Sequence, residues 1–179
     1  MSEPGPGQDS VGAELTTWIG QMPAGVDQDI EAARQRIGRI SRQFGQVLAR
    51  AAARHDLTVG DWEALSVLHR SGPACTPKQL AETLGLTAGT ISIRIDRLIQ
   101  AGLVEHVAAA DGRSRPVRLT RKGRHRWRAA TNARAAYEEQ IFASALTGEQ
   151  LAQLNPLLAT LLARFEQEFG PASRHDVTR

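Results

Sequence analysis

The residues best suited to chemistry in this chain are basic side chains gathered between positions 87 and 128. This segment holds ten Lys and Arg side chains against three acids, whereas the other 137 residues hold twelve basic and sixteen acidic side chains. The segment therefore carries a charge of about +7 and the remainder about −4. Positive charge concentrated in a patterned segment is suited to holding a phosphate backbone, so the charge pattern predicts a nucleic acid as partner.

The chain lacks the residue patterns of the common enzyme classes. It has no Gly-rich phosphate loop, no Gly-x-Ser-x-Gly motif and no metal-ligand spacing among its five histidines. We therefore predict that it is not an enzyme and that it binds no cofactor and no metal. The single cysteine, Cys75, excludes an intramolecular disulfide and a Cys-based zinc finger. A small residue in a turn is favoured for Cys75 over a redox sensor, which would need an exposed thiol of low pKa.

Hydropathy gives no sign of a membrane protein. There is no run of 18 apolar residues, and no basic segment leads into an apolar stretch at the N-terminus. We therefore expect no membrane span, no secretory signal and a cytoplasmic location.

The N-terminal part divides into an arm and a long helix. Residues 1–26 are rich in Gly, Pro, Ser and acids and predict a mostly disordered arm, in which residues 15–22 could form one helical turn. Residues 27–56 show the apolar spacing of a helix with a narrow seam. So long a helix is hard to bury in a small domain, and we expect it to cross a subunit interface. The predicted interface residues on it are Ile30, Ile37, Ile40 and Phe44.

Residues 57–120 predict a helix-turn-helix followed by a wing. A short helix begins at Thr76 and stops at Gly85, and Thr87 caps the next helix, which Gly102 ends. Two short helices joined by a tight turn that contains Gly form a helix-turn-helix. Two short β-prone runs follow, separated by an Asp-Gly turn signal, and they predict a two-stranded wing.

Residues 121–169 predict two further long helices, of which the first begins with basic turns. The second carries another apolar seam, with Leu154, Leu158, Leu161 and Phe165 as predicted dimerisation residues. Pro156 interrupts this seam, and a proline inside a helix costs about 3 kcal/mol. We therefore expect a kink there, or a fresh start with Asn155 as cap. Residues 170–179 predict a disordered tail.

The predicted fold class is mainly α with a small β-hairpin wing, a winged helix-turn-helix with long N- and C-terminal dimerisation helices. This order of elements resembles the MarR family of bacterial winged-helix regulators over about residues 27–169. The matching residues are Leu57-Thr58 with Trp62, Leu80-Ala81-x-x-Leu84-Gly85-Leu86, the run from Gly89 to Leu98 with Ala101-Gly102-Leu103-Val104, and Asp111-Gly112-Arg113 with Val117-x-Leu119-Thr120 and Gly123. Each match is weak alone, and together they are specific.

The resemblance implies that the helix capped by Thr87 enters the major groove and that a wing arginine reaches the minor groove. Asp111 would orient the guanidinium of Arg113, two residues later. The predicted DNA-binding residues are Thr87, Thr90, Ser92, Ile93, Arg94, Arg97, Arg113 and Arg115, with Asp111 as the wing anchor.

Three of these residues have a second interpretation. Thr87 could act only as the N-cap of its helix, although both roles are compatible. Arg94 could instead pair with Asp111 or Glu82 and brace the motif. Ile93 stands where the family commonly has a polar or basic residue, and it contacts a thymine methyl group or simply faces water.

We therefore expect a homodimeric, sequence-specific transcriptional regulator of a bacterial cell, a repressor that binds a pseudo-palindromic double-stranded operator and is nucleoid-associated when bound. The alternative is a winged-helix protein-interaction module or a nonspecific architectural DNA-binding protein. The resemblance implies that an effector, if there is one, is a small aromatic or phenolic molecule. Trp62 and Phe44 would border its site, although core packing is the simpler interpretation of Trp62.

Overall fold

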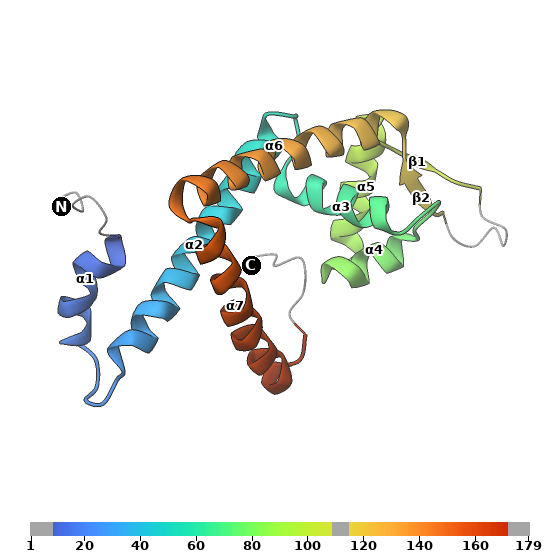
Figure 1. Cartoon of the computed structure of the whole chain (residues 1–179). Helices are drawn as coiled ribbons and strands as arrows, with labels where there is room; N and C mark the ends of the chain where they lie inside the picture. The colour runs from blue at the N-terminus through green and yellow to red at the C-terminus, as the bar shows by residue number, and fades with distance from the viewer. Residues whose placement is uncertain (1–8, 109–114, 172–179) are drawn as a thin grey trace. The chain divides into compact units, whose positions relative to one another are not determined.

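The computed structural model describes residues 9–108 and 115–171. The elements follow the order α1 (Ser10–Ile19), α2 (Gln28–Ala53), α3 (Val59–Arg70), α4 (Pro77–Leu84), α5 (Ala88–Gln100), β1 (Val104–His106), β2 (Val117–Leu119), α6 (Arg121–Ala145) and α7 (Gly148–Phe169) (Figure 1). The prediction of a mainly helical chain with a small antiparallel hairpin is confirmed. Contacts divide the chain into two units, Met1–Val47 and Leu48–Arg179, and α2 crosses the division.

The first unit contains a helix where the sequence predicted a mostly disordered arm. Asp9 caps α1 by accepting a hydrogen bond from the Gly12 backbone amide at 2.6 Å. Trp18 Nε1 donates to Glu31 Oε1 of α2 at 2.9 Å, and Arg36 Nε of α2 donates to Asp9 Oδ2 at 2.7 Å. The helix depends on these partners far along the chain, because ten residues are too few for a stable isolated helix.

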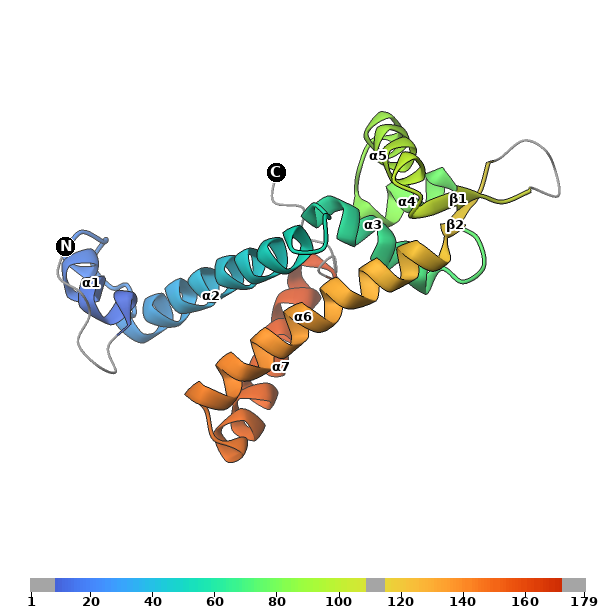
Figure 2. The ribbon, with the colours of Figure 1, turned by 90° about the horizontal axis from the view of Figure 1, so that it is seen from above.

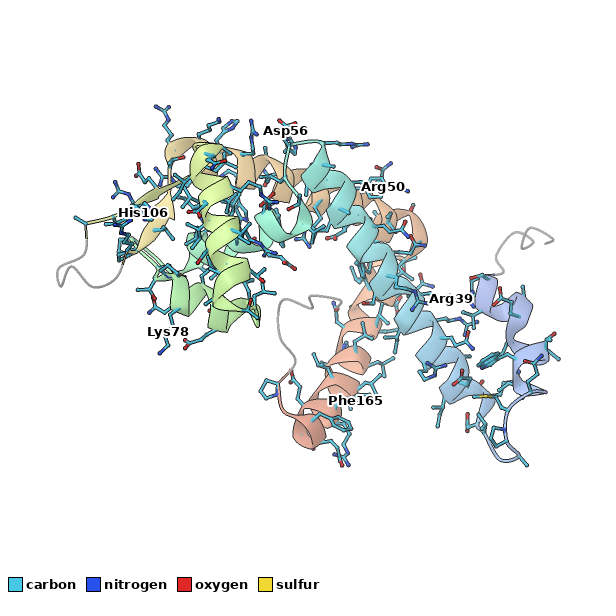
Figure 3. The ribbon with its side chains drawn as sticks, turned by 180° about the vertical axis from the view of Figure 1, so that it is seen from behind. Arg39, Arg50, Asp56, Lys78, His106 and Phe165 are labelled. Carbon is cyan, nitrogen blue, oxygen red and sulfur yellow. The ribbon has the colours of Figure 1, made fainter. Side chains whose placement is uncertain are left out.

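The contact between α1 and α2 is reinforced by further charged groups on α2. Arg39 extends toward α1 and donates to Glu14 Oε2 at 2.6 Å (Figure 3). Hydrogen bonds from Arg34, then from Gln35 and Trp18, lower the pKa of Glu31 to about 2. Glu31 therefore remains an ionised acceptor for α1 throughout the neutral range.

The second unit contains the winged helix-turn-helix. Its fully buried side chains come from every element of the motif, and they include Leu65, Leu80, Ile91, Leu98 and Leu103. Figures 1 and 2 show α3, α4 and α5 gathered beside the β1–β2 hairpin and the start of α6. The hairpin is tied to the segment before α4 by two backbone hydrogen bonds of 2.9 Å between Cys75 and Val117. The wing therefore packs on the same hydrophobic core as the helices.

The tight turn of the helix-turn-helix follows from its residue types. Thr76 and Gln79 form a reciprocal capping box at the start of α4, as the sequence predicted. Gly85 ends the helix with φ 63°, a left-handed conformation that favours glycine. Thr87 then caps α5 by accepting a hydrogen bond from the Thr90 amide at 3.3 Å. These local signals set the order and spacing of the two helices.

The prediction of a fresh helix start at Asn155 is wrong. Helix α7 runs without interruption from Gly148 to Phe169, with Pro156 inside it. The leucines and alanines on both sides are strong helix formers, and their preference outweighs the hydrogen bond that proline removes.

The two predicted seams are exposed apolar surface. On α2, Ile30, Ile37, Ile40 and Phe44 are exposed, and on α7 the exposed side chains are Leu157, Leu158, Leu161, Leu162, Phe165 and Phe169, with Leu154 half-buried. The exposed set on α7 is therefore wider than the predicted one. The periodicity of 3.6 residues places the seam of α2 on the side opposite the residues that contact α1. Within the described residues no helix is long and apolar enough to span a membrane.

Gly123 in the first turn of α6 lies directly against the backbone of Leu103. A Cβ added at position 123 would overlap the Leu103 carbonyl oxygen. We expect Gly123→Ala to lower the free energy of unfolding by about 1–3 kcal/mol, because backbone on both sides leaves nothing to move aside. Urea unfolding monitored by circular dichroism measures the change.

Gly45 in α2 offers a matched control, since no atom lies within 4 Å of a Cβ added there. Gly45→Ala should raise stability by about 0.5–1 kcal/mol, because alanine is the better helix former. Equal stability of the two variants would contradict the close contact at Gly123.

Candidate nucleic-acid interface

Helix α5 has one buried face and one open face. Ile91, Ile95 and Leu98 are buried against the rest of the motif. On the open face Ile93 is 72% exposed, and a Cβ added at Gly89 would have no atom within 4 Å. The helix predicted to read DNA therefore presents one complete face to solvent.

The hydroxyl groups of the first turns of α5 are exposed but bonded locally. The hydroxyl groups of Thr87 and Thr90 lie 2.9 Å apart, and Ser92 Oγ donates to the Ala88 carbonyl oxygen at 3.0 Å. Thr87 is the N-cap, as the second interpretation required, and its exposed side chain leaves contact with DNA open to it.

Arg94 is turned toward α3 and away from the open face. Its Nη1 donates to the Gly60 carbonyl oxygen at 3.0 Å and lies 3.9 Å from Glu63 Oε2. Only 16% of its side chain is exposed. This placement favours the bracing role over contact with DNA, with Gly60 and Glu63 as partners in place of the predicted Glu82, which pairs with Lys78 at 3.9 Å.

Arg97 lies at the edge of the open face and is held at one end. Its Nη2 donates to Asp61 Oδ1 and lies 3.4 Å from Thr58 Oγ1. The other carboxylate oxygen of Asp61 accepts hydrogen bonds from the Thr58 amide at 3.0 Å and the Thr58 hydroxyl at 2.7 Å. Because 54% of the Arg97 side chain is exposed, its guanidinium can still donate to a ligand.

The contact of Asp61 with Arg97 was not predicted from the sequence. Asp61 forms a reciprocal cap with Thr58 at the start of α3. The cap uses only one of its two carboxylate oxygens, and α5 takes the other. A pairing across 36 residues leaves no local signal in the sequence.

Glu63 of α3 has a buried carboxyl group. Burial raises the pKa of its carboxyl group, and the nearby Arg94 guanidinium opposes that rise. The pair at 3.9 Å therefore offsets part of the cost of a buried carboxylate.

The wing is described up to its tip. Arg118 of β2 donates to Glu105 Oε1 of β1 at 2.7 Å, across the hairpin, and Arg115 is exposed. Asp111 and Arg113 lie outside the described residues, so the predicted pairing of the two stays a prediction.

Several basic side chains in the first turns of α6 bond other groups of the chain. Lys122 Nζ donates to the Ala101 carbonyl oxygen and Arg124 Nη1 to the Leu119 carbonyl oxygen, both at 2.8 Å. Arg126 pairs with Asp56 at 3.4 Å. These cations join the start of α6 to the ends of neighbouring elements.

Two tryptophans join α3 to α6. Trp62 Nε1 donates to Thr131 Oγ1 at 2.9 Å, and Trp127 Nε1 donates to Ser66 Oγ at 2.8 Å. Both rings pack against the hydrophobic core, which agrees with the core interpretation of Trp62. Satisfied indole groups on both helices fix α6 relative to α3.

Neither Cys75 nor the potential metal ligands of the described residues indicate redox or metal chemistry. Cys75 is buried, and burial raises the pKa of its thiol. That environment opposes the reactive thiolate that a redox sensor needs. The residue pairs with Val117 in a β-bridge, however, and does not lie in the predicted turn. Among residues 9–108 and 115–171, no three His, Cys, Asp or Glu side chains are grouped as a metal ion requires.

Residues 55–114, which span the helix-turn-helix and the wing tip, match the model of the MarR family. The resemblance to the MarR family is confirmed. A comparison with curated proteins finds no match.

Solved structures of several bacterial proteins share the fold. The apo form of MarR from E. coli is 23% identical with a TM-score of 0.63, covering 79% of this chain and 97% of its own. YusO from Bacillus subtilis is 18% identical with a TM-score of 0.66, covering 76% and 96%. A mutant of S. aureus MepR bound to an oligodeoxyribonucleotide is 22% identical with a TM-score of 0.60, covering 74% and 97%. At these identities the likeness establishes the winged-helix fold.

Replacing Arg94 tests its bracing role. Arg94→Met leaves the buried Glu63 carboxylate without its cation, so the pKa of Glu63 should rise further above the usual 4.5. At pH 7.5 the unfolded chain ionises freely while the folded chain bears the cost, and stability should fall by about 1–3 kcal/mol. Near pH 4, where Glu63 is mostly protonated in both states, the loss should be smaller. Urea unfolding at both pH values measures the difference.

The double variant Arg94→Met with Glu63→Gln is the matched control, since it removes the titrating group. Its stability relative to the wild type should not depend on pH in this way. An equal loss at both pH values in the single variant would contradict the pairing.

Proposed function

We propose that this chain is a dimeric, sequence-specific DNA-binding transcriptional regulator of the MarR type, acting as a repressor on a pseudo-palindromic operator. The observation that carries the proposal is the open face of α5, held rigidly by α3 within a MarR-family winged helix. Solved relatives of this fold include MepR bound to an oligodeoxyribonucleotide and E. coli MarR complexed with operator DNA. The predicted roles of Thr87, Thr90, Ser92, Ile93 and Arg97 agree with their exposure on that helix.

The proposal includes a two-fold dimer, in which the seams of α2 and α7 are buried by a second copy. Contiguous apolar patches of this kind mark interaction sites in proteins that function in water. Two reading helices related by a two-fold axis would contact half-sites about one helical turn, roughly 10 bp, apart. A cytoplasmic location follows from this role, and release by a small aromatic or phenolic effector is the part that the resemblance alone suggests.

A winged helix used for protein contact or for nonspecific DNA packaging is the competing function. Selection of bound sequences from random duplex DNA separates the two. Enrichment of a pseudo-palindrome supports the regulator, whereas equally tight binding of arbitrary duplexes, or none, would reject it.

The wing should contribute through its arginines. We expect Arg113→Ala and Arg115→Ala each to weaken binding to the selected operator by about 1–3 kcal/mol without changing the unfolding midpoint. Each should also reduce the slope of log affinity against log salt by about 1 if its guanidinium neutralises a phosphate. Fluorescence anisotropy over a salt series measures both quantities.

Arg164→Ala on α7 serves as the control, because it removes one positive charge that already pairs with Glu168 at 2.9 Å. It should leave the affinity and the slope unchanged. Wing variants that behave like this control would remove the wing from the interface.

The dimer is tested by placing charge in the α2 seam. Ile37→Glu puts a carboxylate where the proposed partner buries an exposed side chain, so we expect monomers in sedimentation and loss of operator binding. Gln46→Glu places the same charge on the opposite face of α2, where Gln46 is exposed, and should remain dimeric. A stable Ile37→Glu dimer would show that another surface forms the interface.

A further inference from the structure

Ile93 is an exposed apolar side chain without a structural role in the folded chain. Within residues 57–108 and 115–136 it is the only exposed large hydrophobic residue, and its exposure is 72%. The other apolar positions of α5 that point inward, Ile91, Ile95 and Leu98, are buried. The stability of the motif therefore does not explain Ile93.

Ile93 lies at the centre of the open face of α5. The 3.6-residue period aligns it with Gly89 about one turn before, with Asp96 about one turn after and with Gln100 about two turns after. All four positions are exposed, and nothing lies within 4 Å of a Cβ added at Gly89. The missing side chain at position 89 lets another molecule approach the helix backbone closely beside Ile93.

The chemistry of this central strip suits base edges and not phosphates. Isoleucine offers no hydrogen bond, and the Asp96 carboxylate repels phosphate. The cation that borders the strip is Arg97, which Asp61 holds at the edge of the face. In the major groove the apolar feature is the 5-methyl group of thymine. A β-branched side chain in a helix has essentially one χ1 rotamer, so it loses little entropy when it packs against that methyl group.

We propose that Ile93 determines sequence specificity by packing against the 5-methyl group of one thymine in each operator half-site. This inference rests on the proposed function and adds the chemical group that α5 selects. Water is displaced from two apolar surfaces that are both exposed before binding, which favours thymine over cytosine at that position.

Replacing thymine with deoxyuridine tests the contact, because it removes only the methyl group. In a duplex carrying the selected operator, each thymine is replaced in turn and affinity is measured by anisotropy. We expect one position per half-site to weaken binding roughly fourfold, and about sixteenfold when both half-sites are changed, from a value of about 0.8 kcal/mol per buried methyl-sized group. Ile93→Ala should bind the thymine and deoxyuridine duplexes equally.

Ile141→Ala on α6 is the matched control, because it truncates the same residue type at a position that is 44% exposed outside the motif. It should keep the full sensitivity to deoxyuridine. Position 93 is exposed within a helix, so alanine there should preserve the fold.

The outcomes separate the two proposals. If no operator is enriched, the proposed function fails and the inference fails with it. If an operator is enriched but no thymine position is sensitive, or if Ile93→Ala keeps the sensitivity of the wild type, only the role of Ile93 is overturned.

Discussion

The orientation of α5 depends on the first turn of α3. Arg94 and Arg97 reach back from α5 to that turn, where Arg94 bonds the Gly60 carbonyl oxygen and Arg97 bonds Asp61. A Cβ at position 60 would lie 2.5 Å from Arg94 Nη2, so a side chain there would displace the Arg94 guanidinium. Apolar packing beneath α5 fixes its depth, whereas these directional bonds resist its rotation. For the proposed contact of α5 with DNA both restraints matter, because ordering the helix on binding would cost affinity.

The contacts of Arg94 and Arg97 with α3 change the electrostatic field expected around the basic segment between positions 87 and 128. Several of its cations already have acidic partners outside the segment: Arg94 with Glu63, Arg97 with Asp61 and Arg126 with Asp56. The field outside the protein is therefore weaker than a net charge of about +7 suggests. Weaker general attraction lowers affinity for arbitrary DNA, and it leaves a larger share of the binding energy to contacts with base edges.

The sequence predicted those parts of the fold that local chemistry determines. The start of α4 at Thr76, its end at Gly85 and the two strands follow from neighbouring residues, and they appear as predicted. Helix α1 was missed because its partners lie on α2, such as Glu31 for Trp18.

The candidate site divides in the same way. The open face of α5 follows from its 3.6-residue period, and the exposure of Thr90, Ile93 and Arg97 agrees with it. The inward turn of Arg94 does not follow, because its partner Gly60 lies 34 residues away and offers only a backbone carbonyl group. Every residue type carries a backbone carbonyl group, so no residue pattern predicts this contact.

The role proposed for the exposed seam of α2 depends on what the opposite face of the same helix contacts. There α1 is held by Asp9, Glu14 and Trp18, mostly through charged hydrogen bonds. An apolar surface is less costly to leave exposed if it is small, but the α2 seam extends over four turns from Ile30 to Phe44. Because α1 is held on the other side by polar groups, it does not compete for that seam. A second copy can therefore cover the seam while α1 stays in place, and the polar and apolar faces of α2 serve two different contacts.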